Sequence, residues 1–167
     1  GHGISVNLVQ LARAYTIFAG DGELKPVSLL KVDGPVAGRP VVTARTAQAV
    51  RHMLEMVVEP GGTAPKAQIA GYRVAGKTGT AHKLEGHVYA DKYVSSFVGF
   101  APVSNPRLIV AVMLDEPGAG QYYGGTVAAP VFADVMGAAL RLLGVAPDAP
   151  ANRVVVPADD IAVREET

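Results

Sequence analysis

The sequence contains no cysteine and no tryptophan, and only 6% of its 167 residues are aromatic. The missing cysteine excludes disulfide frameworks and cysteine-based metal sites. An excess of one charge is also missing, because Lys+Arg and Asp+Glu each number 15 and the formal net charge is +0. Without a basic excess, the chain lacks the electrostatic footprint of a nucleic-acid-binding protein or of a polybasic membrane-surface segment. We therefore expect no nucleic-acid partner.

What the sequence has is enough apolar material for one folded domain, since 49% of its residues are hydrophobic. Its longest purely apolar run, residues 108–114, is far too short to cross a bilayer. The chain begins Gly1-His2-Gly3-Ile4 without an initiator Met or a signal sequence, so we expect a piece of a longer protein. We expect one domain portion over residues 1–147 and a loosely packed tail over residues 148–167, where proline and charge increase.

The order of the expected elements favours an α+β fold. Helical spacing of apolar residues predicts helices that begin near Asn7 and Thr43, and a closing helix capped by Thr126. Extended segments are predicted over residues 26–32, 72–81, 93–101 and 108–114. The last of these is apolar on both faces, as a fully covered central strand would be. A turn at residues 104–106 predicts an antiparallel hairpin, and helices segregated from strands predict an antiparallel sheet flanked by helices.

Residues 71–78 match the phosphate-loop pattern G-x-x-x-x-G-K-T, and Asp115 and Glu116 follow a strand as a magnesium-binding carboxylate would. A phosphate loop needs a flexible loop that leads into a helix, whose N-terminus faces the phosphates. Here the intervening Tyr, Arg, Val and Ala favour a strand, and no amphipathic helix follows Thr78. A P-loop-like nucleotide-binding protein, with its site at Gly71 to Thr78, is therefore the alternative and not the main hypothesis.

Two further motifs suggest serine chemistry. Ser28 and Lys31 fit S-x-x-K, but that motif needs a helical turn to bring the amine beside the hydroxyl, and the segment is predicted to be extended. Ser5 and Asn7 fit S-x-N at the entrance of a helix, where both residue types are ordinary caps. We expect neither serine to be a nucleophile. His82 and His87 lie five apart in a predicted loop, which matches no common ligand spacing, so we expect no metal and no cofactor.

The segment Lys77-Thr78-Gly79-Thr80 carries the main functional hypothesis. Gly79 has no side chain, so a substrate backbone can lie against the strand at that point. Thr78 and Thr80 can donate hydroxyl hydrogen bonds to a carboxylate, and Lys77 adds positive charge. The Thr80 N–H could serve an oxyanion hole. A strand with a glycine bulge and no function remains the alternative.

Stretches along nearly the whole chain support a family resemblance. They include residues 1–6, 8–15, 31–33, 59–62, 71–81, 99–102, 122–125 and 129–132. On these residues the chain resembles the C-terminal part of the transpeptidase domain of class B penicillin-binding proteins, of the division-specific (septal) type. The resemblance implies part of the penicillin-binding protein and serine β-lactamase-like transpeptidase fold. A penicillin-recognising sensor or a β-lactamase of the same fold is a further alternative.

The family's activity is peptidoglycan D,D-transpeptidation by serine acyl transfer, with stem peptides as substrates and β-lactams as mimics. The resemblance implies that Lys77 organises the hydroxyl of the S-x-N motif and that the Thr80 N–H joins the oxyanion hole. It also implies that Thr78 and Thr80 hold the carboxylate of the substrate or β-lactam, with Gly79 between them in the substrate-binding segment. Tyr93, Tyr122 and Tyr123 resemble the family's aromatic wall, with ordinary packing as the alternative for them.

The chain departs from the family pattern because only the third of its three motifs matches. The nucleophilic Ser and its Lys are expected upstream of Gly1, so the fragment alone should be inactive. Two strands are also expected upstream, which would leave an apolar edge on residues 108–114. The resemblance implies inner-membrane anchoring with the domain on the periplasmic side, and division-complex partners that include a glycan polymerase. A non-catalytic scaffold or binding fragment remains an alternative.

Overall fold

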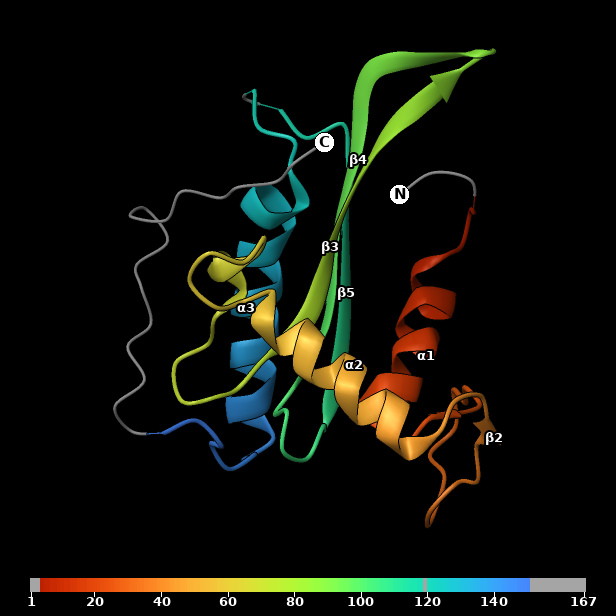
Figure 1. The fold of residues 1–167 in the computed structure, drawn as a ribbon, viewed down its shortest axis with the longest axis vertical. Coiled ribbons are helices and arrows are strands. Elements are labelled where there is room, and N and C mark those ends of the chain that lie inside the picture. The colour runs from red at the N-terminus through yellow and green to blue at the C-terminus, as the bar shows by residue number, and fades with distance from the viewer. Residues whose placement is uncertain (1–3, 119, 151–167) are drawn as a thin grey trace.

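The computed structural model describes residues 4–118 and 120–150. Three antiparallel strands form a sheet, with α1 and α3 on its two faces and α2 packed against both α1 and β3 (Figure 1). The chain order is helices first, then strands, then a helix, which confirms the expected α+β class. In the tail expected over residues 148–167, Asp148 is described and hydrogen-bonds Gly71, Arg73 and Ser104. Residues 151–167 of that tail and the motif residues Gly1 to Gly3 lie outside the described residues.

The first two helices begin where their caps predict. The helix α1, Leu8–Ala19, starts at Asn7, whose side chain accepts the Gln10 N–H while the Gln10 side chain binds the Asn7 N–H. This reciprocal capping box satisfies two amides that have no partner within the helix. The helix α2, Ala44–Met56, starts at Thr43, whose hydroxyl accepts the Thr46 N–H. Both predicted N-caps are confirmed.

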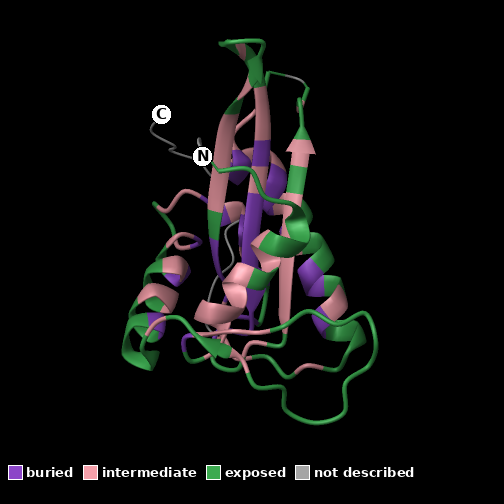
Figure 2. Ribbon diagram, turned by 90° about the vertical axis from the view of Figure 1, so that its right-hand side faces the viewer, coloured by how far each residue is buried: buried purple, intermediate pink, exposed green. Residues whose placement is uncertain are grey.

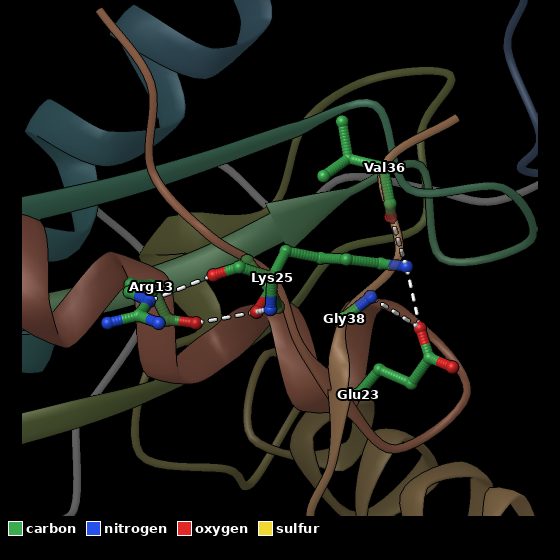
Figure 3. A network of polar contacts seen from close by, with 6 residues as sticks. Arg13, Glu23, Lys25, Val36 and Gly38 are labelled. Atoms are coloured by element: carbon green, nitrogen blue, oxygen red, sulfur yellow. Dashed lines mark hydrogen bonds and ion pairs between the residues drawn. The ribbon is translucent and has the colours of Figure 1, made fainter. Parts of the chain in front are cut away.

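The segment between these helices is a loop, and the extended segment predicted over residues 26–32 is not a strand. Only β1, Glu23–Leu24, and β2, Arg39–Pro40, pair here, as two short antiparallel strands. Figure 3 shows the contacts that fix the loop: the Lys25 ammonium binds a Glu23 carboxylate oxygen at 2.7 Å and the Val36 carbonyl at 3.0 Å. The Arg13 guanidinium donates to the Lys25 carbonyl at 2.8 Å, which ties the loop to α1.

The sheet has the order β3-β4-β5, and its strands are Ala75–Glu85, Val88–Ala101 and Leu108–Asp115. The hairpin expected between the last two strands is confirmed. The prediction that β3 begins at Tyr72 was wrong, because residues 72–74 lie before the strand. The prediction that residues 82–86 form a loop was also wrong. Instead, β3 continues to Glu85 and pairs with the start of β4 at Val88. These parts of β3 and β4 form a long two-stranded hairpin that projects from the rest of the sheet (Figure 1).

The strand β5 is an edge strand in the described part of the chain, and most of its residues are only half buried. The fully covered central position predicted for it is therefore wrong for the described residues. The expected free apolar edge is confirmed, because β5 pairs only with β4 among the described strands.

The helix α3 is Gly124–Leu142, with Tyr123 as its N-cap residue. The prediction that Thr126 caps this helix was wrong, because the Thr126 N–H already bonds the Tyr123 carbonyl inside the first turn. By length and composition, α3 is the only helix among the described residues that could span a membrane, with a mean hydropathy of 1.3. Its buried side packs on the sheet, as in the core helix of a folded domain.

The main core lies between α3 and the sheet, and Figure 2 shows its buried residues along the middle of the molecule. Phe97 and Phe132 pack edge to face at its centre, with ring centroids 4.7 Å apart. A smaller cluster around Phe100 lies on the other face, under Tyr15, Phe18 and Leu54. Helices therefore cover both faces of β4. The segment Lys77 to Thr80 lies on β3, the neighbour of β4 in this sheet.

Candidate active site

The residues Lys77 to Thr80 lie in the straight part of β3, which forms one edge of the sheet. They pair in unbroken antiparallel register with Val98, Phe97, Ser96 and Ser95 of β4. No other described strand pairs with the opposite edge of β3. Because side chains alternate along a strand, Thr78 and Thr80 share one face while Lys77 and Gly79 share the other. The segment is thus an open strand edge, the geometry that an extended, peptide-like ligand needs.

The Lys77 ammonium and the Thr78 hydroxyl form the first polar group of the site. The Lys77 Nζ lies 3.1 Å from the Thr78 Oγ1 and 3.3 Å from the Thr78 carbonyl oxygen. The Thr63 hydroxyl lies 3.2 Å from the Thr78 hydroxyl and comes from the turn before the short helix Pro65–Ala67. An ammonium beside two hydroxyls can bind a carboxylate with charge-assisted hydrogen bonds.

The Thr80 hydroxyl meets the first amide of α3. The Gly124 N–H donates to the Thr80 Oγ1 at 3.1 Å. This bond satisfies one of the helix amides that have no intrahelical partner, and it brings the positive end of the helix dipole against β3. Since the Thr80 oxygen accepts this amide, its own proton points away from the helix. The arrangement favours negative charge next to Thr80.

The missing Cβ of Gly124 makes this close approach possible. A Cβ on Gly124 would lie 2.4 Å from the Ser96 carbonyl oxygen and 2.8 Å from the Gly79 carbonyl oxygen. A Cβ on Gly79 would lie 2.5 Å from the Ser96 Oγ, on the other face. Only glycine lets the start of the helix rest directly on the strand backbone.

The three predicted tyrosines form a row of ring contacts next to this segment. The rings of Tyr93 and Tyr122 are parallel within 10°, with centroids 3.9 Å apart, and Tyr123 follows at 4.6 Å from Tyr122. His82 contacts the other side of Tyr93 at 4.4 Å. Burial, helped by the neighbouring Asp91 carboxylate, raises the pKa of Tyr93 to about 12. The structure therefore places the three tyrosines near Thr80, at the end of the segment Lys77 to Thr80.

A cavity of about 520 Å³ opens on the α1 face of the sheet beside Gly79. The Ser96, Val94 and Met113 side chains contribute to its lining from β4 and β5, and Leu8 and Leu11 of α1 form another part. Its lining is mostly apolar, so it suits the side chains of a covering segment better than it suits water.

The phosphate-loop and S-x-x-K motifs do not form sites, whereas Ser5 and Asn7 of the S-x-N match line the cavity beside Gly79. The residues of the phosphate-loop match lie in a turn and then in β3, with no helix after Thr78, so the nucleotide hypothesis was wrong. The Ser28 hydroxyl bonds the backbone of Leu30 in an exposed loop, which agrees with its rejection as a nucleophile. No group of three or more His, Asp or Glu side chains that could hold a metal occurs among the described residues.

Sequence analysis missed three residues that the structure places at the site. Thr63 and Gly124 lie far from the motif along the chain, and no local pattern connects them to it. Ser95 is fully buried opposite Thr80, and its hydroxyl donates to the Tyr122 carbonyl. A serine flanked by the apolar residues Val94 and Phe97 was the one signal that could have indicated it.

Comparison with known proteins decides the family. The sequence profile described as the penicillin binding protein transpeptidase domain matches residues 1–137. The chain belongs to this family. Its fold class and its resemblance to the class B proteins are confirmed by the relatives described next.

Two relatives illustrate the similarity. The chain is 50% identical over 151 residues to the probable peptidoglycan D,D-transpeptidase PenA of Neisseria flavescens, covering 90% of this chain and 38% of that protein. It is 46% identical over 151 residues to the peptidoglycan D,D-transpeptidase FtsI of Escherichia coli K12, covering 89% of this chain and 26% of that protein. The chain therefore spans well under half the length of these transpeptidases.

A solved structure agrees with the same assignment. The apo transpeptidase domain of penicillin-binding protein 3 from Burkholderia pseudomallei is 52% identical and superimposes with a TM-score of 0.83. The superposition covers 90% of this chain but 46% of the Burkholderia chain. This member of the family thus corresponds to less than half of a complete transpeptidase domain of that kind.

Proposed function

We propose that this chain supplies the carboxylate-binding strand of a serine-type, penicillin-binding peptidoglycan D,D-transpeptidase that crosslinks the septal cell wall. The observation that carries the proposal is the open edge of β3, where Lys77, Thr78 and Thr80 present an ammonium and two hydroxyls. These groups suit the terminal carboxylate of a D-Ala-D-Ala stem peptide, or the carboxylate of a β-lactam. The similarity to PenA and FtsI supports the same activity.

Each residue has a role in this proposal. Thr78 and Thr80 bind the carboxylate, and Gly79 lets the ligand backbone approach the strand. The Thr80 N–H donates to the oxygen of the tetrahedral intermediate, and Lys77 orients the hydroxyl of an S-x-N motif. Tyr93, Tyr122 and Tyr123 form an aromatic wall at the end of the groove. The site needs no cofactor and no metal.

The nucleophile comes from outside this chain in our proposal. The serine attacks the carbonyl of the penultimate D-Ala, the last D-Ala leaves, and an amine of a neighbouring strand accepts the acyl group. Neither Ser5 nor Ser28 has a lysine one helical turn away, since Ser5 lies just before α1 and Ser28 lies in a loop. The serine and its lysine therefore belong to an upstream part of the domain. This chain alone should form no acyl-enzyme.

The same upstream part would cover the surfaces that the described residues leave open. The free edge of β5 and the cavity beside Gly79 are both apolar, and the Burkholderia domain is more than twice as long as the matched segment. We propose that upstream strands extend the sheet at β5. The domain portion over residues 1–147 then completes one transpeptidase domain. Anchoring in the inner membrane on the periplasmic side, and contact with division-complex proteins including a glycan polymerase, complete the proposal.

Labelled penicillin tests this function. We expect a stoichiometric adduct on the complete domain, at a serine outside residues 1–167, and none on this chain alone. The two samples should be compared by intact-mass spectrometry after equal exposure. An adduct on this chain alone would contradict the proposal. Absence of any adduct on the complete domain would instead favour the scaffold alternative.

A further inference from the structure

Ser95 is a buried hydroxyl directly behind the proposed carboxylate site. It lies in the middle strand β4, opposite Thr80 in the register of the sheet, and its exposed fraction is 0%. The Ser95 hydroxyl donates to the backbone carbonyl of Tyr122, in the turn that leads into α3. A buried polar side chain weakens the core unless its hydrogen bond is made, so the bond to Tyr122 is the reason that Ser95 is tolerated there.

The bond from Ser95 fixes the start of α3. Tyr122 lies two residues before Gly124, whose N–H donates to the Thr80 Oγ1. The same glycine is wedged against the backbone of Gly79 and Ser96, with no room for a Cβ. A small shift of the Tyr122 carbonyl would therefore move the Gly124 amide relative to Thr80, because one intervening residue cannot absorb it freely.

The strand β4 holds Tyr122 at a second point. Tyr93 lies two residues before Ser95, on the same face of the strand, and its ring stacks on the Tyr122 ring. One strand thus holds Tyr122 through both its carbonyl and its ring. The ring contact alone permits sliding within the stack, whereas the hydrogen bond specifies the position of the backbone.

We propose that Ser95 is a positioning residue for carboxylate recognition. By holding the Tyr122–Gly124 turn, it keeps the Gly124 N–H on the acceptor side of the Thr80 hydroxyl, so that the hydroxyl proton faces the ligand carboxylate. Ser95 does not touch the ligand and acts through Gly124 and Thr80. This inference rests on the proposed function and adds a determinant of its specificity for carboxylate-bearing acyl donors.

The test compares two ligands that differ only in the carboxylate. Acylation rate constants are measured on the complete transpeptidase domain, with benzylpenicillin and with its methyl ester. Ser95→Ala should slow acylation by the free acid about tenfold, which corresponds to a weakened hydrogen bond to a charged group. It should slow acylation by the ester less than about twofold, because the ester carries no charge for Thr80 to bind. Ser28→Ala removes a serine hydroxyl from the exposed loop and should leave both rates unchanged.

A double-mutant cycle with Thr80→Val shows whether Ser95 acts through Thr80. If it does, Ser95→Ala should change the free-acid rate less than about twofold in the Thr80→Val background. Should the Ser95→Ala domain unfold below the assay temperature, Ser95→Cys is tested in its place, because cysteine has a similar volume and a weak S–H donor. Ser95→Cys should lower the acylation rate less than Ser95→Ala, and again more with the free acid than with the ester.

Three outcomes would overturn the inference while leaving the proposed function intact. They are an unchanged rate with the free acid, an equal loss with both ligands, and additive effects of the two substitutions. Failure of the unmodified domain to react with either ligand would contradict the proposed function itself, and the inference with it.

Discussion

Arg73 and Glu55 form a two-pronged ion pair between the segment that leads into β3 and the helix α2. The Arg73 Nε lies 2.6 Å from one Glu55 carboxylate oxygen, and an Arg73 terminal nitrogen lies 2.7 Å from the other. The hydrogen bonds to Glu55 raise the pKa of Arg73 further above its ordinary value. The pair ties α2 to the strand that carries the proposed site, four residues before Lys77.

Removal of the Glu55 carboxylate should destabilise the domain. Glu55→Ala leaves a half-buried guanidinium without its partner, and we expect a loss of about 2 kcal/mol in the free energy of unfolding. The loss is smaller than for a fully buried pair, because 35% of the Arg73 side chain stays exposed. Urea denaturation measures it. Asp33→Ala is the control, since the Lys31–Asp33 pair is almost fully exposed, and it should change stability very little. Equal effects of the two substitutions would contradict this account.

The two glycines at the junction of β3 and α3 should respond differently to an added methyl group. Gly124→Ala puts a Cβ 2.4 Å from backbone, which cannot move without shifting the helix, and we expect a loss of about 2–3 kcal/mol together with weaker penicillin acylation. Gly79→Ala meets the Ser96 hydroxyl, a side-chain atom that can rotate away, so its cost in stability should stay below about 1 kcal/mol. Thermal unfolding of both variants checks the order, and the reverse order would contradict the packing described.

The stability of the domain should fall at high pH because of Tyr15. Burial raises the pKa of Tyr15 from 10.0 to about 12. Between these values the unfolded state loses the phenolic proton and the folded state keeps it. Stability is therefore fully present below pH 10 and decreases as the pH rises toward 12, by up to about 2 kcal/mol. Urea denaturation at several pH values should show a shallower decrease for Tyr15→Phe. An equally steep decrease in that variant would contradict the assignment to Tyr15.

Asp148 should matter more than its position near the end of the chain suggests. One of its carboxylate oxygens accepts the Arg73 N–H at 2.7 Å, and the other accepts the Ser104 N–H at 3.0 Å. The Asp148 amide itself donates to the Gly71 carbonyl at 3.1 Å. Asp148→Ala removes both acceptors, and we expect a loss of about 2 kcal/mol in the free energy of unfolding. Asp134→Ala, on the exposed side of α3, is the matched control and should be nearly neutral. Equal stability of the two variants would show that this contact contributes nothing.

The sequence predicted the parts of the fold that short-range chemistry determines. The caps Asn7 and Thr43 were identified because a cap lies within three residues of the amide that it binds. The straight strand at Lys77 to Thr80 was identified because its neighbours have strong strand preferences and no helix follows.

Long-range contacts explain the errors. The start of α3 at Gly124 depends on Thr80, 44 residues away, so the sequence favoured Thr126 as the cap instead. The extension of the hairpin is a different case, because its contacts, such as the one between Lys92 and Glu85, join residues only seven apart in the chain. The roles of Ser95 and Asp148 likewise require distant partners. The part of the site that lies on β3 was therefore predictable, whereas the parts that support it were not.

The most direct test of the central claim is the structure of the complete domain after acylation by a penicillin. We predict that the ligand lies along the edge of β3, with its carboxylate within hydrogen-bond distance of the Thr78 and Thr80 hydroxyls and its acyl bond to a serine outside residues 1–167. A carboxylate bound elsewhere, or an acyl bond to a residue of this chain, would contradict the account.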